Sequence, residues 1–219
     1  PDGDFVHGSA TWAHNIVTFG PHWNGDVGME LRRPPVTVQL GEAFDYAVAD
    51  LSMNNVRREV WRNMQPIAAV EYFRHLLFAH NRYVVVWDRI TRSIYPSQLR
   101  INCLSRSVEV DGNELRFAGL DGVDLRVHVA APAAPTCHEA LLGPMRYVLI
   151  EQACELDYLW VCQPLGPDEQ PFEIASGPTG LTVTGADLHG ERFTDTITLA
   201  PPPGEPPPAP RAHRVDDYP

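Results

Sequence analysis

The chain has 219 residues, of which 44% are hydrophobic and 21% are charged. That length suffices for one domain that buries roughly 70% of its unfolded surface, and that composition excludes a disordered, collagen-like or coiled-coil protein. All 17 basic residues are arginine, against 28 acidic residues, so the formal net charge is −11. A chain this acidic lacks the basic stripe that non-specific nucleic-acid binding needs, and no apolar run is long enough to span a membrane.

Apolar residues recur with period two along most of the chain, which is typical of strands with one buried and one exposed face. In chain order, this pattern predicts strands at Ile16 to Phe19, Val36 to Leu40, Ala43 to Leu51, Glu71 to Ala79, Tyr83 to Trp87, Leu99 to Cys103, Ser107 to Phe117 (a hairpin), Leu125 to Val129, Arg146 to Gln152, Tyr158 to Gln163, Leu181 to Thr184 and Phe193 to Leu199. The best candidate for a helix is Asn54 to Asn63.

Two of these segments carry the strongest signals. Tyr83 to Trp87 is apolar on both sides, which predicts a central strand covered on both faces, with Glu71 to Ala79 as its neighbour. Asp111, Gly112 and Asn113 tolerate positive φ between two alternating runs, which predicts a tight hairpin. We therefore expect an all-β fold, a large two-layer antiparallel β-sandwich over residues 1–200.

The last segment, residues 201–219, differs from the rest in composition. It holds 8 of the 21 prolines in 19 residues. Because proline lacks the amide donor that a sheet requires, we expect an extended or disordered tail that does not pair in a sheet and adds nothing to stability.

Familiar catalytic signatures are absent from the sequence. There is no GxGxxG, GxxxxGK[ST], HExxH or GxSxG motif, so nothing supports nucleotide binding, zincin proteolysis or α/β-hydrolase chemistry. The four cysteines form no CxxC pair, which excludes a zinc ribbon. His7, His14 and His22 form the densest group of histidines and could converge on a zinc ion, although ordinary polar loop histidines are the commoner case.

The segment Thr11 to Gly20 resembles a motif of the heparinase II/III-like polysaccharide lyases. Their β-sandwich domain has a Ser- or Thr-led stretch ending in Ala-His-Asn, here Ala13-His14-Asn15, followed by a short apolar strand and a glycine. The family then has a strand with arginine and aromatics, and an apolar strand that closes with Asp-Arg. Val70 to Arg74 and Tyr83 to Ile90 match these in order, and the resemblance covers most of residues 5–200.

This resemblance implies an enzyme, periplasmic or secreted, that cleaves uronic-acid-containing glycans by β-elimination. It also implies an N-terminal α/α toroid that supplies the tyrosine, the asparagine and one histidine of the active site, and first strands that supply another histidine and metal ligands. The sequence has room for neither, so we expect an N-terminally truncated β-sandwich that is inactive on its own and has no catalytic residue. His14 alone carries over, as a histidine at or next to zinc in the complete enzyme. We expect no tightly bound zinc here.

Other residues allow weaker interpretations. Arg57, Arg58 and Arg62 could bind an acidic polysaccharide, since guanidinium pairs bidentately with carboxylates, or could simply be solvated. Asp88 is expected to be a structural partner of Arg89 or of backbone amides. Two other functions stay open: a non-catalytic carbohydrate-binding or scaffolding β-sandwich, and an unrelated sandwich enzyme with a histidine metal site. Whether the chain itself is an enzyme is therefore undecided.

Overall fold

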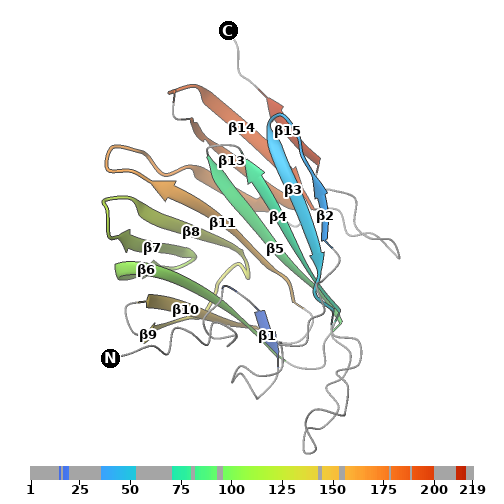
Figure 1. Ribbon diagram of the computed structural model, residues 1–219, viewed down its shortest axis with the longest axis vertical. Coiled ribbons are helices and arrows are strands. Elements are labelled where there is room, and N and C mark those ends of the chain that lie inside the picture. The colour runs from blue at the N-terminus through green and yellow to red at the C-terminus, as the bar shows by residue number, and fades with distance from the viewer. Residues whose placement is uncertain are drawn as a thin grey trace, which may run out of the picture.

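The computed structural model describes residues 15, 17–19, 36–52, 71–79, 82–92, 96–142, 145–152, 156–177, 179–187, 189–199 and 211–215. None of these residues is helical, and no membrane-spanning helix is found among them. Their strands form one sheet of 11 and one of four, with every pairing antiparallel (Figure 1). The predicted all-β, antiparallel sandwich class is confirmed, with sheets of unequal size.

The strands are named here in chain order. They are β1 (Val17–Phe19), β2 (Val36–Gln39), β3 (Phe44–Asp50), β4 (Glu71–Ala79), β5 (Tyr83–Arg92), β6 (Ser97–Asp111), β7 (Glu114–Gly119), β8 (Asp124–Ala131), β9 (Cys137–Leu142), β10 (Met145–Gln152), β11 (Tyr158–Leu165), β12 (Glu173–Gly177), β13 (Gly180–Ala186), β14 (Arg192–Thr198) and β15 (Arg211–Val215). The large sheet has the order β2-β3-β4-β5-β11-β8-β7-β6-β10-β9, with β1 paired to β6, and the small sheet has the order β12-β13-β14-β15.

The strand β5 lies between β4 and β11 and is covered on both faces. Successive side chains of a strand point to opposite faces. Val86 and Ile90 therefore join one hydrophobic core, whereas Tyr83, Val85 and Trp87 join another. This confirms the central strand predicted from the run of apolar residues, and also its pairing with β4.

The first core lies inside the curve of the large sheet. The 15-residue strand β6 pairs with β10 through its first half and with β7 through its second half, and Figure 1 shows it between those two strands. A register shift between Ser105 and Ser107 marks a bulge, and bulges bend strands. Leu99 and Ile101 of the first half consequently pack in the same core as Val127 and Trp160 of the opposite wall.

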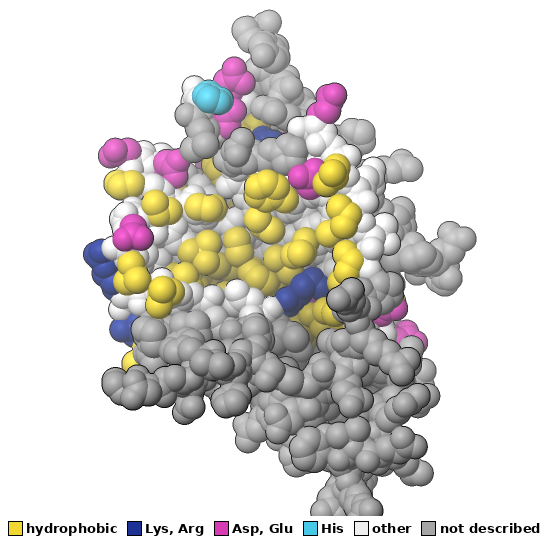
Figure 2. Space-filling model, in the orientation of Figure 1, with side chains coloured by type: hydrophobic (Ala, Val, Ile, Leu, Met, Phe, Trp, Pro, Cys, Tyr) yellow, Lys and Arg dark blue, Asp and Glu magenta, His cyan; other side chains and the backbone are white. Residues whose placement is uncertain are grey.

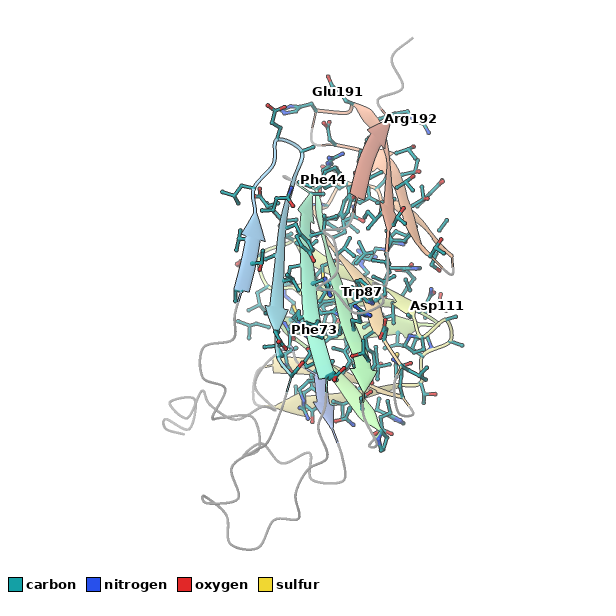
Figure 3. The ribbon with its side chains drawn as sticks, turned by 90° about the vertical axis from the view of Figure 1, so that its right-hand side faces the viewer. Phe44, Phe73, Trp87, Asp111, Glu191 and Arg192 are labelled. Atoms are coloured by element: carbon teal, nitrogen blue, oxygen red, sulfur yellow. The ribbon has the colours of Figure 1, made fainter. Side chains whose placement is uncertain are left out.

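The second core lies between the large and small sheets. Leu181 and Val183 of β13 and Phe193 of β14 pack with side chains of β4, β5 and β11. Figure 3, which turns the molecule by 90°, shows the small sheet standing beside the strands of the large one. The hydrophobic patterns of β13 and β14 therefore reflect burial against the outer face of the large sheet.

The predicted hairpin at Ser107 to Phe117 is confirmed. Asp111 pairs with Glu114, and Gly112 has a φ of 59°, a left-handed conformation that glycine adopts without steric cost. The strands β9 and β12 were not predicted. The strand β12 has only one half-buried side chain, Ile174, so its sequence lacks the alternation that reveals a strand.

Two expectations concern other parts of the chain. The expectation that residues 201–219 do not pair in a sheet is wrong for five of them, because Arg211–Val215 pairs with β14 as β15. These five residues contain no proline, so every one keeps the amide donor that a ladder needs. The candidate helix Asn54 to Asn63 lies outside the described residues.

Candidate functional site

A buried ion pair joins β4 and β5 beside Asn15, the last residue of the Ala-His-Asn motif. The antiparallel register places Arg74 directly opposite Asp88, whose side chain is fully buried. Arg74 donates from Nε to Asp88 Oδ1 (2.6 Å) and from Nη2 to Asp88 Oδ2 (2.9 Å). This bidentate geometry is the strongest form of an arginine–carboxylate ion pair.

Two aromatic side chains complete the surroundings of Asp88. The Tyr72 hydroxyl donates to Oδ1 at 2.7 Å, and Trp160 Nε1 donates to Oδ2 at 3.3 Å. The carboxylate thus accepts four hydrogen bonds and has no exposed surface. Asp88 is therefore structural, as expected, but its partners are not Arg89 or backbone amides. Arg89 instead lies over the Trp87 ring, 5.9 Å from its centroid.

Asn15, the last residue of the Ala-His-Asn motif, is attached to this pair. Its carbonyl accepts a hydrogen bond from Arg74 Nη1, and its side-chain Oδ1 accepts one from the backbone amide of Asn102 on β6. Asn15 thereby bridges β4 and β6, and the short strand β1 that follows pairs with β6 from Val17 onward. Asn15, the residue directly after His14, is thus held by two strands of the large sheet, β4 and β6.

The protonation states near Asn15 suit a structural network. Burial, together with the charge of Asp88, raises the pKa of Tyr72 well above its usual value, so the phenol stays protonated and donates. No hydrogen-bonding capacity of Asp88 is left for a substrate, because Arg74, Tyr72 and Trp160 use it. This cluster holds Asn15 in place, and its described residues provide no general base.

Arg100 is the side chain near Asn15 that is best suited to an external anion. It lies on β6, two residues before Asn102, and its guanidinium stands 4.3 Å from the centroid of the Tyr147 ring on β10. No carboxylate pairs with it among the residues that the structure describes. A guanidinium that stacks on an aromatic ring keeps its N–H edge available for a bidentate contact.

A histidine of the second core has no comparable access. His75 is 2% exposed, stacks on Trp87 with ring centroids 4.6 Å apart, and shares a hydrogen bond of 2.7 Å between Nδ1 and the Tyr46 hydroxyl. Burial, aided by the charge of Arg89, lowers its pKa to about 4, so the ring is neutral at pH 7. His75 is a core residue.

The residues predicted from the sequence to bind metal or substrate, His14, Arg57, Arg58 and Arg62, lie outside the described residues, as do His7 and His22. Within the described ranges, no three His, Cys, Asp or Glu side chains group in a way that could hold a metal ion. The Arg74–Asp88 pair was missed, although a signal existed. The three-residue connection after Ala79 pairs Ala79 with Tyr83, and the same register continued down the hairpin pairs Arg74 with Asp88.

Comparison with known proteins rests on structure alone. No protein-family model matches the chain, and no curated protein matches its sequence. The heparan sulfate lyase HepC from Pedobacter heparinus matches with a TM-score of 0.58 at 13% identity, over 91% of this chain and 33% of that chain. A heparinase III with methylated lysines matches with a TM-score of 0.55 at 13% identity, over 91% of this chain and 32% of that chain. The chain therefore has a heparinase-like fold and spans about one third of the length of these enzymes.

Proposed function

We propose that this chain is the β-sandwich portion of a heparinase II/III-like polysaccharide lyase, which cleaves uronic-acid-containing glycans by β-elimination. The observation that carries the proposal is the fold shared with heparan sulfate lyases over 91% of the chain. The Ala-His-Asn motif supports it independently, since the strands β4, β5 and β6 meet around its last residue, Asn15.

The chemistry defines what such a chain can contribute. Elimination requires that the uronate carboxylate be neutralised, that a base remove the neighbouring proton, and that an acid protonate the leaving oxygen. Arg74 and Asp88 would hold the motif in place, and Arg100 would pair with a carboxylate of the glycan. His14 would stand at the metal of the complete enzyme. Because the described residues add no further ligands, we assign no step to a metal.

The remaining part of such an enzyme would pack on the apolar side of this sheet. Figure 2 shows hydrophobic side chains gathered across the middle of one face, with acidic side chains around its margin. Register places Val38 of β2 and Leu76 of β4 on one face, and they are 59% and 39% exposed. Exposed apolar stripes of this kind mark protein interfaces. An α/α toroid in the same polypeptide is the partner we propose.

The test is affinity electrophoresis, in which binding slows the migration of the protein through native gels that contain heparan sulfate or alginate. Arg100→Ala should weaken the apparent affinity about tenfold, because a bidentate contact to a charged group is lost. The matched control is Arg192→Ala, which changes an exposed arginine at the far end of the molecule (Figure 3). Equal retention of the two variants would contradict the role of Arg100. Binding without turnover in the longer protein would favour the non-catalytic carbohydrate-binding function instead.

A further inference from the structure

A second concave site lies where the large and small sheets meet. It is a pocket of about 660 Å³, formed by the adjoining ends of β4 and β5 with Arg82, by the loop after β11, and by described residues at the turn between β13 and β14. Pockets that bind small ligands have volumes of this order and are mostly apolar, with a few placed polar groups. Nothing in the proposed lyase chemistry uses this pocket.

The loop after β11 forms a rigid wall of the pocket. The buried Gln163 side chain accepts the Phe172 amide at Oε1 (3.0 Å) and donates from Nε2 to the Gln170 carbonyl (3.2 Å). Glu169 Oε2 accepts the Gly166 amide at 2.7 Å. The wall is therefore held from both ends by side chains of the protein itself, and a ligand need not order it.

The opposite wall, the turn between β13 and β14, is held in a similar way. Asp187 Oδ1 accepts the amides of His189 (2.8 Å) and Glu191 (3.0 Å), and the Asp187 carbonyl accepts the Gly190 amide (2.9 Å). Gly190 has a φ of 81°, which favours glycine at this position. Both walls are thus preorganised.

The lining combines an apolar surface with acceptors. Phe78, which is 43% exposed, lines it together with Val84 and the buried Phe172. Asp168 and Glu169 add carboxylates, and Asp168 makes no hydrogen bond or ion pair with any described residue. An aromatic ring packs against the C–H face of a sugar, and carboxylates accept hydrogen bonds from its hydroxyl or ammonium groups.

One buried cation also lines the pocket. Arg82 is 8% exposed, and its Nη1 lies 3.3 Å from Asp195 Oδ2 without making a hydrogen bond there or to another described residue. Its guanidinium also stands 4.4 Å from the centroid of the Phe193 ring. Because Asp195 neutralises Arg82, the carboxylates of the lining leave the pocket with net negative charge, which repels an anionic ligand.

We propose that this pocket binds a saccharide unit that carries no negative charge, with the ring against Phe78 and its hydroxyl or amino groups donating to Asp168 and Glu169. The pocket is separate from the Asn15 site. Its β13–β14 turn precedes Glu191 and Arg192, which Figure 3 places at the same end of the molecule as Phe44, whereas Phe73, the neighbour of Arg74, lies toward the other end. The proposal does not depend on lyase activity.

The experiment titrates the whole chain with three tetrasaccharides by calorimetry and ligand-observed NMR. The probes are the N-acetylglucosamine tetramer, the glucosamine tetramer and tetragalacturonate. We expect the first two to bind, and expect the affinity of the glucosamine tetramer alone to fall with salt, because it carries ammonium groups. Asp168→Asn should weaken binding about tenfold, whereas Asp121→Asn, in an exposed turn elsewhere, should not change it.

Filling the pocket gives the second test. Ala186 lines the mouth and is exposed, so Ala186→Trp should abolish binding of both non-anionic tetramers while the thermal midpoint is kept. The control is Ala134→Trp, at another exposed alanine. Tetragalacturonate binding, if seen, should respond to Arg100→Ala and not to Ala186→Trp. The proposal is wrong if neither non-anionic tetramer binds, or if their binding survives Ala186→Trp.

Discussion

Two carboxylates near the end of β5, the buried Asp88 and the half-buried Asp157, differ in how their charge is stabilised. Asp88 has the guanidinium of Arg74 beside it. Asp157 makes no such ion pair with any described residue and instead accepts hydrogen bonds from Trp87 Nε1 (2.9 Å) and the Ile90 amide (2.8 Å), and burial raises its pKa despite those bonds. Arg74 is therefore the one cation that the described residues place against Asp88, and removal of either charge leaves the other without a counter-ion in the interior.

We expect Asp88→Asn to lower the free energy of unfolding by about 3 kcal/mol, because Arg74 would keep its charge in a buried place without a counter-ion. Urea unfolding followed by tryptophan fluorescence measures this loss. The matched control is Asp124→Asn, which breaks the pair with Arg116, an arginine whose side chain is 59% exposed, and should cost about 1 kcal/mol or less. A similar small loss in both variants would show that the buried pair is not stabilised as described.

The stability of the protein should also depend on pH through His75. Its pKa is about 4 in the folded protein and about 6.5 in the unfolded chain. The unfolded chain therefore takes up the proton first, and the free energy of unfolding falls by about 3 kcal/mol as the pH drops from about 6.5 to 4. His75→Phe should remove this part of the pH dependence in urea titrations at a series of pH values.

The comparison with His189→Gln isolates the effect of His75, since His189 is exposed and its replacement should leave the slope unchanged. An identical slope in the wild-type protein and His75→Phe would mean that the pKa of His75 is the same in the folded and unfolded protein, which contradicts the prediction. Asp88 and Arg89, which act on His75 through their charges, are present in all three proteins.

At the scale of the element, the stability of the small sheet depends on how the edge of β14 is covered. The strand β14 has its own buried residues, Phe193 and Ile197, and is paired on one side with β13. Its other side is paired with β15, which comes from the proline-rich segment. Without β15, β14 would present a row of unpaired backbone groups, which is the usual hazard of an edge strand.

Deletion of residues 209–219 should therefore lower the thermal midpoint by a few degrees, because five residues of ladder on β14 are lost. The control deletes only residues 216–219, which leaves β15 intact, and should not change the midpoint. Differential scanning calorimetry distinguishes the two. Equal midpoints for both deletions would restore the original expectation that the tail adds nothing to stability.

At the scale of the whole molecule, two sites of different chemistry lie toward opposite ends of the β4–β5 hairpin. The Asn15 end has Arg74 and Arg100, the latter without a carboxylate partner in the described part of the chain. The other end has the pocket with acidic side chains. The two proposals together assign an acidic glycan to the Asn15 end and a non-anionic sugar to the pocket end.

We expect the 219-residue chain alone to form no unsaturated uronate product from alginate or heparan sulfate, measured by ultraviolet absorbance. Near Asn15, Asp88 is fully hydrogen-bonded and Tyr72 keeps its proton, so the described residues supply no base. Zinc binding measured by calorimetry should be weak, because ligand number sets affinity. If this chain alone turns over substrate and His14→Ala abolishes that activity, the proposal that the catalytic groups come from another part of the enzyme is wrong. Turnover that appears only after N-terminal extension of the chain would support the proposal.

The amino-acid sequence by itself determined the class of fold. Alternation of apolar residues is a local property, so it located nearly all the strands that have one buried face, and the run at Tyr83 to Trp87 identified the strand buried on both. The hairpin at Gly112 was likewise predictable, because positive φ is set within a few residues. The Ala-His-Asn motif pointed to the heparinase-like fold for the same reason, since it is a contiguous pattern.

Only the tertiary structure decided which distant residues meet. The hydrogen bonds from Arg74 and the Asn102 amide to Asn15, and the pocket between two loops, join segments far apart in the sequence, and no local pattern encodes such pairings. The formation of β15 likewise depends on pairing with a segment that is distant in the sequence. Arg211–Val215 is a strand because β14 presents an open edge to it, and an edge exists only after the rest of the sheet has formed.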